Sequence, residues 1–170
     1  MQEIEHKFLV RSMDFLSEAT EAYPIDQGYL HASPPTLRVR VRGEQGFLTI
    51  KGGSDKSGLA REEYEYEIPL SDAKALLALC GPRRLTKTRY LVPYAGYTWE
   101  VDVFSGRHEG LILAELEVTS LDETFPLPPW VGDEVTGNPR YYNGWLAGEQ
   151  EPLYHSYACI APPSGALRKA

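Results

Sequence analysis

The stretch that decides the fold is Glu3-Ile4-Glu5-His6-Lys7, at the start of the chain. Side chains on a β-strand alternate between its two faces, whereas residues two apart on a helix do not face each other. As a strand, the stretch places Glu3, Glu5 and Lys7 in one row, about 7 Å apart along the chain. Such a row suits a divalent cation and a phosphate, but it is also an ordinary solvated strand face. The stretch by itself leaves both interpretations open.

The same alternation recurs along the chain. Residues 36–42 (TLRVRVR) put three arginines on one face, and a turn at residues 43–46 leads to a second strand that ends at Lys51. Together with the opening stretch and a strand at residues 27–30, the pattern predicts about eight strands. The remaining alternating segments are residues 61–68, 85–93, 97–104 and 111–119.

Short helices are expected between the strands. The spacing of apolar residues predicts them at residues 12–22, 71–80 and 140–148. Ser71 is the expected cap of the second helix, and Gly81-Pro82 ends it. Residues 120–139 are rich in Pro and Gly and are expected to be a connection.

The orientation of the strands is not decided by periodicity. If the apolar faces point inward, the protein is a packed or lipid-binding barrel with charges outside. If the charged faces point inward, the interior must be paired, hydrated and filled with ligand, because an isolated buried charge is very costly. The inward set would then comprise Glu3, Glu5, Glu63, Glu65, Glu67, Glu100, Asp102, Glu115 and Glu117 with Lys7, Arg38, Arg40, Arg42, Lys51, Arg61, Lys87 and Arg89.

Length and composition favour one domain. With 170 residues, 42% of them hydrophobic, the chain is long enough for one well-buried domain and short for two. We expect this domain at residues 1–149, followed by an extended or partly disordered tail at residues 150–170.

The charge and the cysteines restrict the partners and the location. A net charge of −7 disfavours a nucleic acid or an anionic membrane as the partner of the surface as a whole. The longest apolar stretch, residues 75–80, is too short to span a bilayer, and no basic segment followed by an apolar run opens the chain. Cys80 and Cys159 lie far apart, which favours reduced structural thiols. We therefore expect a cytoplasmic protein with no nucleic-acid or membrane partner.

The order and shared parity of the charged rows resemble the CYTH domain, the triphosphate tunnel metalloenzyme superfamily, in its compact bacterial form. The resemblance covers residues 1–149, and no single motif is specific without the others. The motifs are E-x-E-x-K at Glu3, Glu5 and Lys7, Q-G-Y-L at residues 27–30, R-x-R at Arg38 and Arg40, T-I-K ending at Lys51, R-x-E-x-E at Arg61, Glu63 and Glu65, K-x-R at Lys87 and Arg89, E-V-D at Glu100 and Asp102, E-L-E at Glu115 and Glu117, W-x-G-x-E-V-T at residues 130–136 and R-Y-x-N at residues 140–143.

The resemblance implies an α+β, mainly antiparallel fold: an eight-stranded closed β-barrel with a charged interior and a few short flanking helices. It also implies hydrolysis or cyclisation of a triphosphate with Mg²⁺ or Mn²⁺. Oxygen ligands suit these hard cations, and Lys and Arg match phosphate oxygens.

The resemblance assigns expected roles to the charged residues. The expected metal ligands are Glu3, Glu5, Glu115 and Glu117. The expected triphosphate-binding cations are Lys7, Arg38, Arg40, Lys51, Arg61, Lys87 and Arg89. Lys87, Tyr29 and Glu5 are the candidate catalytic residues. The argument for Lys87 and Tyr29 is physical: both have an ordinary pKa of about 10, and a tunnel rich in cations would lower the pKa of either one, so that it serves as a base or a proton relay. The alternative for Tyr29 is a packing residue of the tunnel wall. Glu63, Glu65, Glu100 and Asp102 are expected to hold a second metal ion or to pair with the arginines.

Other polar and aromatic residues have ordinary expected roles. Arg42, Arg61 and Glu67 lie nearer the strand ends, and Thr119 stands where many relatives carry a third acid, which weakens the case for a second metal ion. No histidine is an expected ligand: His6, His31, His108 and His155 fall on the outer strand face, in turns, in a loop and in the tail. The outward-pointing aromatic residues, expected to pack under helices or in a homodimer interface, are Trp99, Tyr64, Tyr66 and Tyr90.

The leading functional prediction is a metal-dependent triphosphatase. Inorganic tripolyphosphate is the expected substrate, with thiamine triphosphate or nucleoside triphosphates as further substrates. A class IV adenylyl cyclase is the alternative enzyme, with the same tunnel. The two reactions differ in the attacking group, which is water in the hydrolase and the ribose 3′-hydroxyl in the cyclase. A non-catalytic polyphosphate- or nucleotide-binding module is the third alternative, but the presence of all four candidate metal ligands argues against it.

Overall fold

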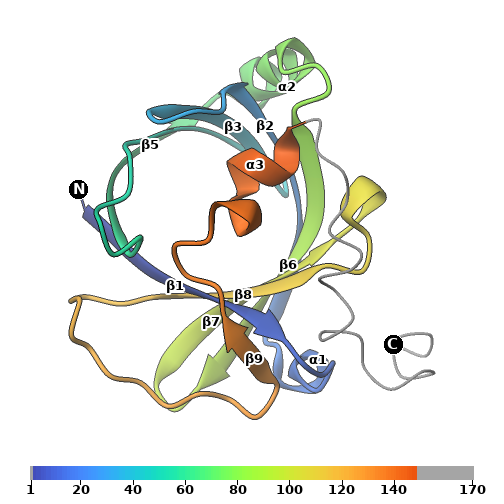
Figure 1. The fold of residues 1–170 in the computed structure, drawn as a ribbon. Helices are drawn as coiled ribbons and strands as arrows, with labels where there is room; N and C mark the ends of the chain where they lie inside the picture. Colours follow the sequence, from blue (N-terminus) through green and yellow to red (C-terminus); the bar gives the residue numbers. More distant parts are fainter. Residues whose placement is uncertain (1, 149–170) are drawn as a thin grey trace.

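A computed structural model describes residues 2–148, which form a closed, antiparallel, eight-stranded β-barrel (Figure 1). The strands follow one another around the barrel in the order β1, β5, β4, β3, β2, β6, β7 and β8, and β8 pairs again with β1. Their bounds are β1 Gln2–Val10, β2 Glu21–His31, β3 Thr36–Arg42, β4 Gln45–Lys51, β5 Ala60–Ile68, β6 Arg84–Tyr94, β7 Tyr97–Phe104 and β8 Ile112–Glu117. The fold predicted from the resemblance is confirmed.

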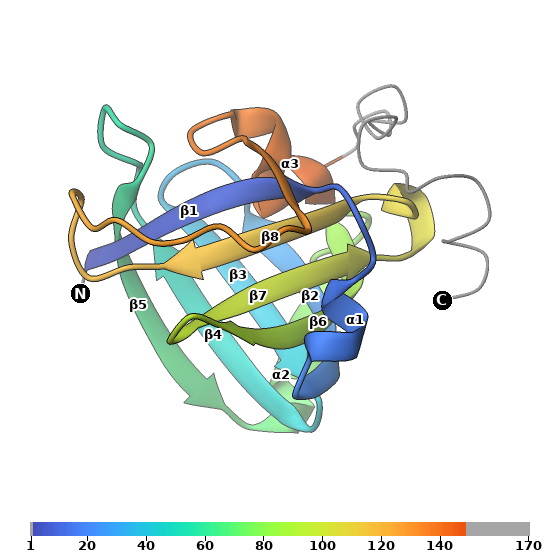
Figure 2. The same ribbon diagram turned by 90° about the horizontal axis from the view of Figure 1, so that it is seen from below.

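The first strand closes the barrel. Residues 2–4 of β1 pair with β5, and residues 5–9 pair with β8 on the other edge (Figure 2). A ninth strand, β9 (Val131–Glu134), pairs with β1 beyond the point where β5 ends its contact. β1 therefore has neighbours along both edges, which leaves little of its backbone unpaired.

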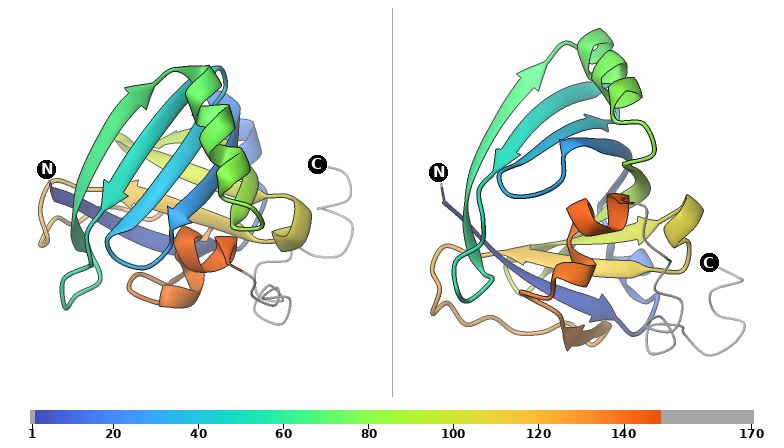
Figure 3. Two further views of the ribbon diagram at one scale, coloured as in Figure 1. Left: turned by 90° about the horizontal axis from the view of Figure 1, so that it is seen from above. Right: turned by 45° about the horizontal axis from the view of Figure 1, so that its top comes forward.

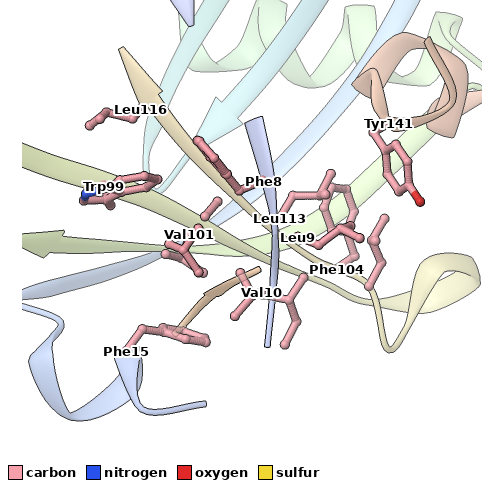
Figure 4. Close-up of a cluster of buried hydrophobic side chains, with 14 of the residues drawn as sticks. Phe8, Leu9, Val10, Phe15, Trp99, Val101, Phe104, Leu113, Leu116 and Tyr141 are labelled. Atoms are coloured by element: carbon pink, nitrogen blue, oxygen red, sulfur yellow. The ribbon is translucent and has the colours of Figure 1, made fainter. Parts of the chain in front are cut away.

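The main hydrophobic core lies outside the barrel, against β1, β7 and β8. Phe8 and Trp99 pack there with Phe15 of α1 (Phe15–Glu18) (Figure 4). The segment between β8 and β9 crosses over them, and the ring centroids of Phe125 and Trp130 lie 6.0 and 5.8 Å from that of Trp99. Trp99 points outward as predicted, and it is fully buried beneath this segment.

Apolar residues also fill one end of the barrel interior. Leu9 and Leu113 lie opposite each other on β1 and β8. Each points inward, because it lies two positions along its strand from an inward-pointing charged residue, Lys7 or Glu115. Figure 4 shows them with Phe104 on the side of Tyr141, which precedes α3 (Asn143–Ala147). The charged interior is therefore confined to the remainder of the barrel.

A second helix covers the other side of the barrel. α2 (Leu70–Leu79) packs on the outer faces of β2, β3 and β4 through Ala73 and Leu77 (Figure 3). Gly46 of β4 permits this contact, because a Cβ atom there would lie 2.6 Å from the Cβ of Ala73. Within residues 2–148 there are also two short 3₁₀ helices: η1 (Gly106–His108), between β7 and β8, and η2 (Pro139–Tyr141), before α3.

Several sequence-based boundaries were wrong. The helix expected at residues 12–22 is only α1, because β2 already begins at Glu21 and pairs with β6 along residues 21–28. This first part of β2 contains Pro24, which lacks a backbone donor and is unusual inside a strand, and the predicted strand covered only residues 27–30. The connection at residues 120–139 contains β9, and α3 begins at residue 143 rather than 140.

The expected cap of α2 was also wrong. The N-cap is Pro69, with no side-chain hydrogen bond, and Ser71 lies inside the helix. The predicted tail, residues 150–170, lies outside the described residues. No helix in residues 2–148 has both the length and the hydropathy of a membrane span.

Candidate active site

The barrel encloses a cavity of about 1120 Å³ lined by charged residues from strands far apart in sequence. Fourteen of the sixteen candidate site residues line it: Glu3, Glu5, Lys7, Tyr29, Arg38, Arg40, Lys51, Arg61, Glu63, Glu65, Arg89, Glu100, Glu115 and Glu117. The side chains of Lys87 and Asp102 are 0% exposed and lie behind the cavity wall. Arg42, expected nearer the rim, also lines the cavity, whereas Glu67 is not among the lining residues.

The cations of β3 and β4 are held by acids of β5 and β1. The Nη2 atom of Arg38 donates to the Thr49 hydroxyl at 3.2 Å and lies 3.7 Å from Glu65. The Lys51 ammonium donates to Glu3 Oε2 at 2.8 Å and lies 3.7 Å from Glu63. These pairs fix the direction of both cations while leaving them at the cavity surface.

Arg40 differs from these cations. Its Nε donates to Gln27 Oε1 at 3.1 Å, and within residues 2–148 it forms no ion pair. Burial, with repulsion from Arg38 and Arg89, lowers the pKa of Arg40 to about 9. A buried guanidinium without a carboxylate partner is costly, so an anionic ligand in the cavity would stabilise it.

The neighbouring strands β6 and β7 carry a self-paired group, which we call the β6–β7 pairs: Lys87, Arg89, Glu100 and Asp102. Asp102 accepts from the Lys87 ammonium at 2.5 Å and from Arg89 Nε and Nη2 at 2.7 and 2.8 Å, and Glu100 accepts from Arg89 Nη1. Although burial opposes ionisation, Arg89 and Lys87 keep the pKa of Asp102 below its ordinary value. Burial lowers the pKa of Lys87 to about 7 despite the contact with Asp102.

The strands β1 and β8 carry the opposite arrangement, which we call the β1–β8 carboxylates: Glu3, Glu5, Glu115 and Glu117. Burial raises the pKa of Glu5 to about 8, and the charges of Glu115 and Glu3 add to the effect. Burial acts in the same direction on Glu115, but Lys7 and Arg89 hold the pKa of Glu115 well below its ordinary value. Both cations lie 3.8 Å from the Oε1 atom of Glu115, which makes no hydrogen bond although it is buried.

The β1–β8 carboxylates fit a divalent cation by their chemistry. In residues 2–148 no three His, Cys, Asp or Glu side chains are already gathered around a metal position. Nevertheless, burial and neighbouring carboxylates raise the pKa of Glu5, Glu3 and Glu117, so a cation bound among them would stabilise their ionised forms, although Lys51 already contacts Glu3. Oxygen ligands of this kind suit Mg²⁺ or Mn²⁺. Glu3 must release Lys51 to take part.

The predicted proton-transfer pair is not joined in the structure. The Tyr29 hydroxyl lies 3.4 Å from Gln27 Nε2, and no hydrogen bond links it to Lys87 among the described residues. Lys87 instead donates to Asn143 Oδ1 at 3.1 Å, in addition to its contact with Asp102. Tyr29 lines the cavity. Lys87 does not line it, but Lys87 is hydrogen-bonded to Asn143, which does.

The sequence interpretation missed the contribution of the C-terminal end of the domain. Tyr142, Asn143 and Trp145 line the cavity, and the Tyr142 ring lies 5.2 Å from the guanidinium carbon of Arg61. The only available signal was the R-Y-x-N motif at residues 140–143, because a short helix has too few turns to show which face is buried.

The sequence matches the CYTH domain over residues 1–142. This chain belongs to the CYTH domain family. It is 44% identical over 147 residues to an inorganic triphosphatase of Acetivibrio thermocellus, covering 85% of this chain and 92% of that protein. It is 41% identical over 154 residues to an inorganic triphosphatase of Nitrosomonas europaea, covering 86% of this chain and 97% of that protein.

Solved structures agree with this assignment to the CYTH domain family. A crystal structure of an inorganic triphosphatase superposes with a TM-score of 0.64 at 36% identity, covering 88% of this chain and 96% of that one. The barrel fold is therefore shared with a protein of this name.

Proposed function

We propose that this protein hydrolyses inorganic tripolyphosphate to pyrophosphate and orthophosphate, using Mg²⁺ or Mn²⁺. The observation that carries the proposal is the cavity itself, where Arg40, which has no carboxylate partner within residues 2–148, and other cations surround buried carboxylates, among them Glu5, whose pKa is raised to about 8. The two relatives at 44% and 41% identity, both named inorganic triphosphatase, support the same substrate.

The cations of the cavity would bind the triphosphate. Guanidinium groups match phosphate oxygens, often with two parallel hydrogen bonds, and an ammonium acts as a point charge. Arg40 is available without breaking a pair, whereas Arg38 and Lys51 would exchange part of their contact with glutamates for phosphate oxygens. The proposed substrate-binding residues that line the cavity are Lys7, Arg38, Arg40, Lys51, Arg61 and Arg89.

The β1–β8 carboxylates would hold the metal ion. When bound there, Mg²⁺ or Mn²⁺ supplies positive charge to phosphate oxygens and makes a water molecule more acidic. Glu5 is the least compensated ligand, so we assign it the central place among them. We propose that Glu63, Glu65, Glu100 and Asp102 serve as pairing residues, because each already contacts a cation.

Lys87 remains the proposed proton acceptor. Burial lowers its pKa to about 7, so a substantial fraction is a neutral amine at neutral pH. Water attacks the terminal phosphorus, the P–O bond to the neighbouring phosphate breaks, and the proton of the water passes toward Lys87. Tyr29, in the cavity wall, is the proposed relay for that proton.

Organic triphosphates are proposed as further substrates. Tyr23, Leu91 and Trp145 line the same cavity as the charged residues and offer apolar surface to a thiamine or nucleoside group. The volume of about 1120 Å³ exceeds the usual range for drug-sized ligands, so both parts of such a molecule fit inside.

One experiment tests the proposed function. Phosphate release is measured from tripolyphosphate, ATP and thiamine triphosphate with Mg²⁺ or Mn²⁺, and cyclic AMP is assayed in parallel. We expect tripolyphosphate to have the highest kcat/KM, with no turnover in EDTA. Folded protein that turns over none of them would disprove the enzyme assignment, and cyclic AMP formation would replace it with a cyclase.

Location and oligomeric state also remain proposals. We propose a cytoplasmic location, which accords with the buried, free thiol of Cys80. We also propose a homodimer through the outer face of β4 and β5, where Ile50, Tyr64 and Tyr66 are 37%, 46% and 55% exposed. Light scattering on wild type and a Tyr64→Lys, Tyr66→Lys double variant tests the homodimer; a monomeric wild type would exclude it.

A further inference from the structure

The C-terminal end of the domain crosses the barrel in a segment that we call the plug segment, residues 139–148. It comprises η2 and α3, and Figure 1 shows α3 within the outline of the strand ring. Tyr142, Asn143 and Trp145 of the plug segment line the cavity, so it is part of the cavity wall.

The plug segment contacts two of the candidate lysines directly. Lys87 Nζ donates to the Asn143 side-chain oxygen at 3.1 Å, and Lys7 Nζ donates to the Tyr141 carbonyl at 3.1 Å. Both lysines are buried, so each acceptor replaces water that the ammonium has lost. The position of the plug segment therefore fixes the direction of both ammonium groups.

The plug segment is in turn held by η1. Arg107 Nη2 and His108 Nε2 both donate to the backbone carbonyl of Leu146, at 2.9 and 2.6 Å. His108 is buried and Leu146 is fully buried. A helix as short as α3 is not stable by itself, so such contacts, with its packing, determine where it lies.

A tight approach on the opposite side leaves the plug segment little freedom. A Cβ atom at Gly144 would lie 3.3 Å from the Ala32 carbonyl oxygen and 3.7 Å from the Tyr29 ring. The segment is thus held between β2 and η1, with Asn143 directed at Lys87.

We propose that Asn143 is a positioning residue for Lys87, and that Arg107 and His108 keep it in place through the Leu146 carbonyl. This inference rests on the proposed triphosphatase function. Asn143 fixes the ammonium of Lys87 from the cavity side while Asp102 fixes it from behind. Small misplacements of a catalytic group reduce turnover strongly, whereas substrate binding depends on the cations that line the cavity.

The first test replaces Asn143 by an apolar side chain of similar size. With tripolyphosphate and Mn²⁺, Asn143→Leu is expected to lower kcat about tenfold and to change KM less than about twofold. The matched control is Arg140→Ala, an exposed residue of the same segment, which is expected to keep the wild-type kcat. An unchanged kcat in Asn143→Leu, or a loss that lies only in KM, would overturn the proposal.

The second test separates positioning from folding. His108→Ala is expected to lower kcat about threefold to tenfold, and His108→Gln, whose amide can donate at the place of Nε2, is expected to restore it. Melting temperatures are measured for each variant. A lower melting temperature with an unchanged kcat in His108→Ala would show a purely structural role and contradict the inference.

The outcomes distinguish this inference from the proposed function. A wild-type protein that hydrolyses no triphosphate removes the proposed function. An active wild type with unaffected Asn143→Leu and His108→Ala variants removes only the inference about the plug segment.

Discussion

The β6–β7 pairs and the β1–β8 carboxylates are neighbours in the barrel, yet their charges are balanced differently. In the β6–β7 pairs, Asp102 contacts both Lys87 and Arg89 at 2.5–2.8 Å. In the β1–β8 carboxylates, the cations nearest to Glu115 lie 3.8 Å away, and burial raises the pKa of Glu5 to about 8.

We propose that the difference separates charges with a structural role from charges that bind a ligand. Register contributes to it: Arg89 lies opposite Asp102 and Glu5 lies opposite Glu117, whereas Glu115 lies between Lys7 on β1 and Glu100 on β7. Facing charges of opposite sign stabilise a sheet, and facing charges of like sign destabilise it unless something intervenes. A divalent cation is the natural neutralising group for the second arrangement.

Removing one of the β1–β8 carboxylates is expected to have the largest effect. Glu115→Gln should lower metal-dependent phosphate release about a hundredfold to a thousandfold, because the charge that holds the metal is lost. Phosphate release over a range of Mn²⁺ concentrations checks this. If a folded Glu115→Gln variant keeps activity within about threefold of wild type, the β1–β8 carboxylates do not hold the metal ion.

Breaking the β6–β7 pairs is expected to affect stability instead. Asp102→Asn removes the carboxylate that Lys87 and Arg89 share and leaves the buried Lys87 without an acidic partner within residues 2–148, which should cost about 3–5 kcal/mol of unfolding free energy. Urea unfolding without metal measures it. The matched control, Glu65→Gln, removes a partly exposed acid and should cost less than about 1 kcal/mol. Equal costs for the two variants would contradict the assignment.

Arg40 offers a test on the cationic side. Arg40→Met should raise the KM for tripolyphosphate about tenfold to a hundredfold, because charged hydrogen bonds to phosphate are lost. The melting temperature should stay the same or rise, since burial opposes the charge of Arg40 and lowers its pKa to about 9. A lower melting temperature with an unchanged KM would make Arg40 a structural residue.

The pH dependence of turnover tests Lys87. Burial lowers its pKa to about 7 from the ordinary value of 10.5, and only the neutral amine accepts a proton. As pH rises through about 7, the neutral form increases, so kcat should rise about tenfold per pH unit below that value and then level off. Stopped assays from pH 5.5 to 9 with saturating Mn²⁺ give the profile. A kcat that stays flat across this range would remove Lys87 as the base.

The smallest effect is expected for Glu65. It accepts a hydrogen bond from the Thr49 hydroxyl at 3.0 Å and lies 3.7 Å from Arg38, and its side chain is 38% exposed. Glu65→Gln should therefore change kcat/KM less than about threefold. A larger loss would mean that Glu65 contacts substrate or metal.

Alternation along the chain was sufficient to predict which residues share a face. The three arginines of β3 and the carboxylates of β1 and β8 were assigned from spacing alone, because a strand has a period of two. Periodicity did not say which face points inward; that came from the order of the motifs. It also did not say that β1 pairs with both β5 and β8, because strand pairing is not local in sequence.

The ion pairs between strands and the contacts of the plug segment could not be predicted from the sequence, for physical reasons. Whether a charge is neutralised depends on the register between strands, which decides that Asp102 faces Arg89. His108 was placed in a loop and given no role, yet it is buried against Leu146 because the chain returns there 38 residues later. Such contacts follow from the path of the chain, not from a local pattern.

The central claim is that the β1–β8 carboxylates, and not the β6–β7 pairs, hold a divalent cation. Isothermal titration of Mn²⁺ into the full chain without substrate tests it directly, with Glu5→Gln and Glu100→Gln as a matched pair of variants. We expect wild type and Glu100→Gln to bind Mn²⁺ with affinities within about threefold of each other, and Glu5→Gln to lose at least about tenfold. Unchanged Mn²⁺ binding in Glu5→Gln, with loss in Glu100→Gln, would contradict the account.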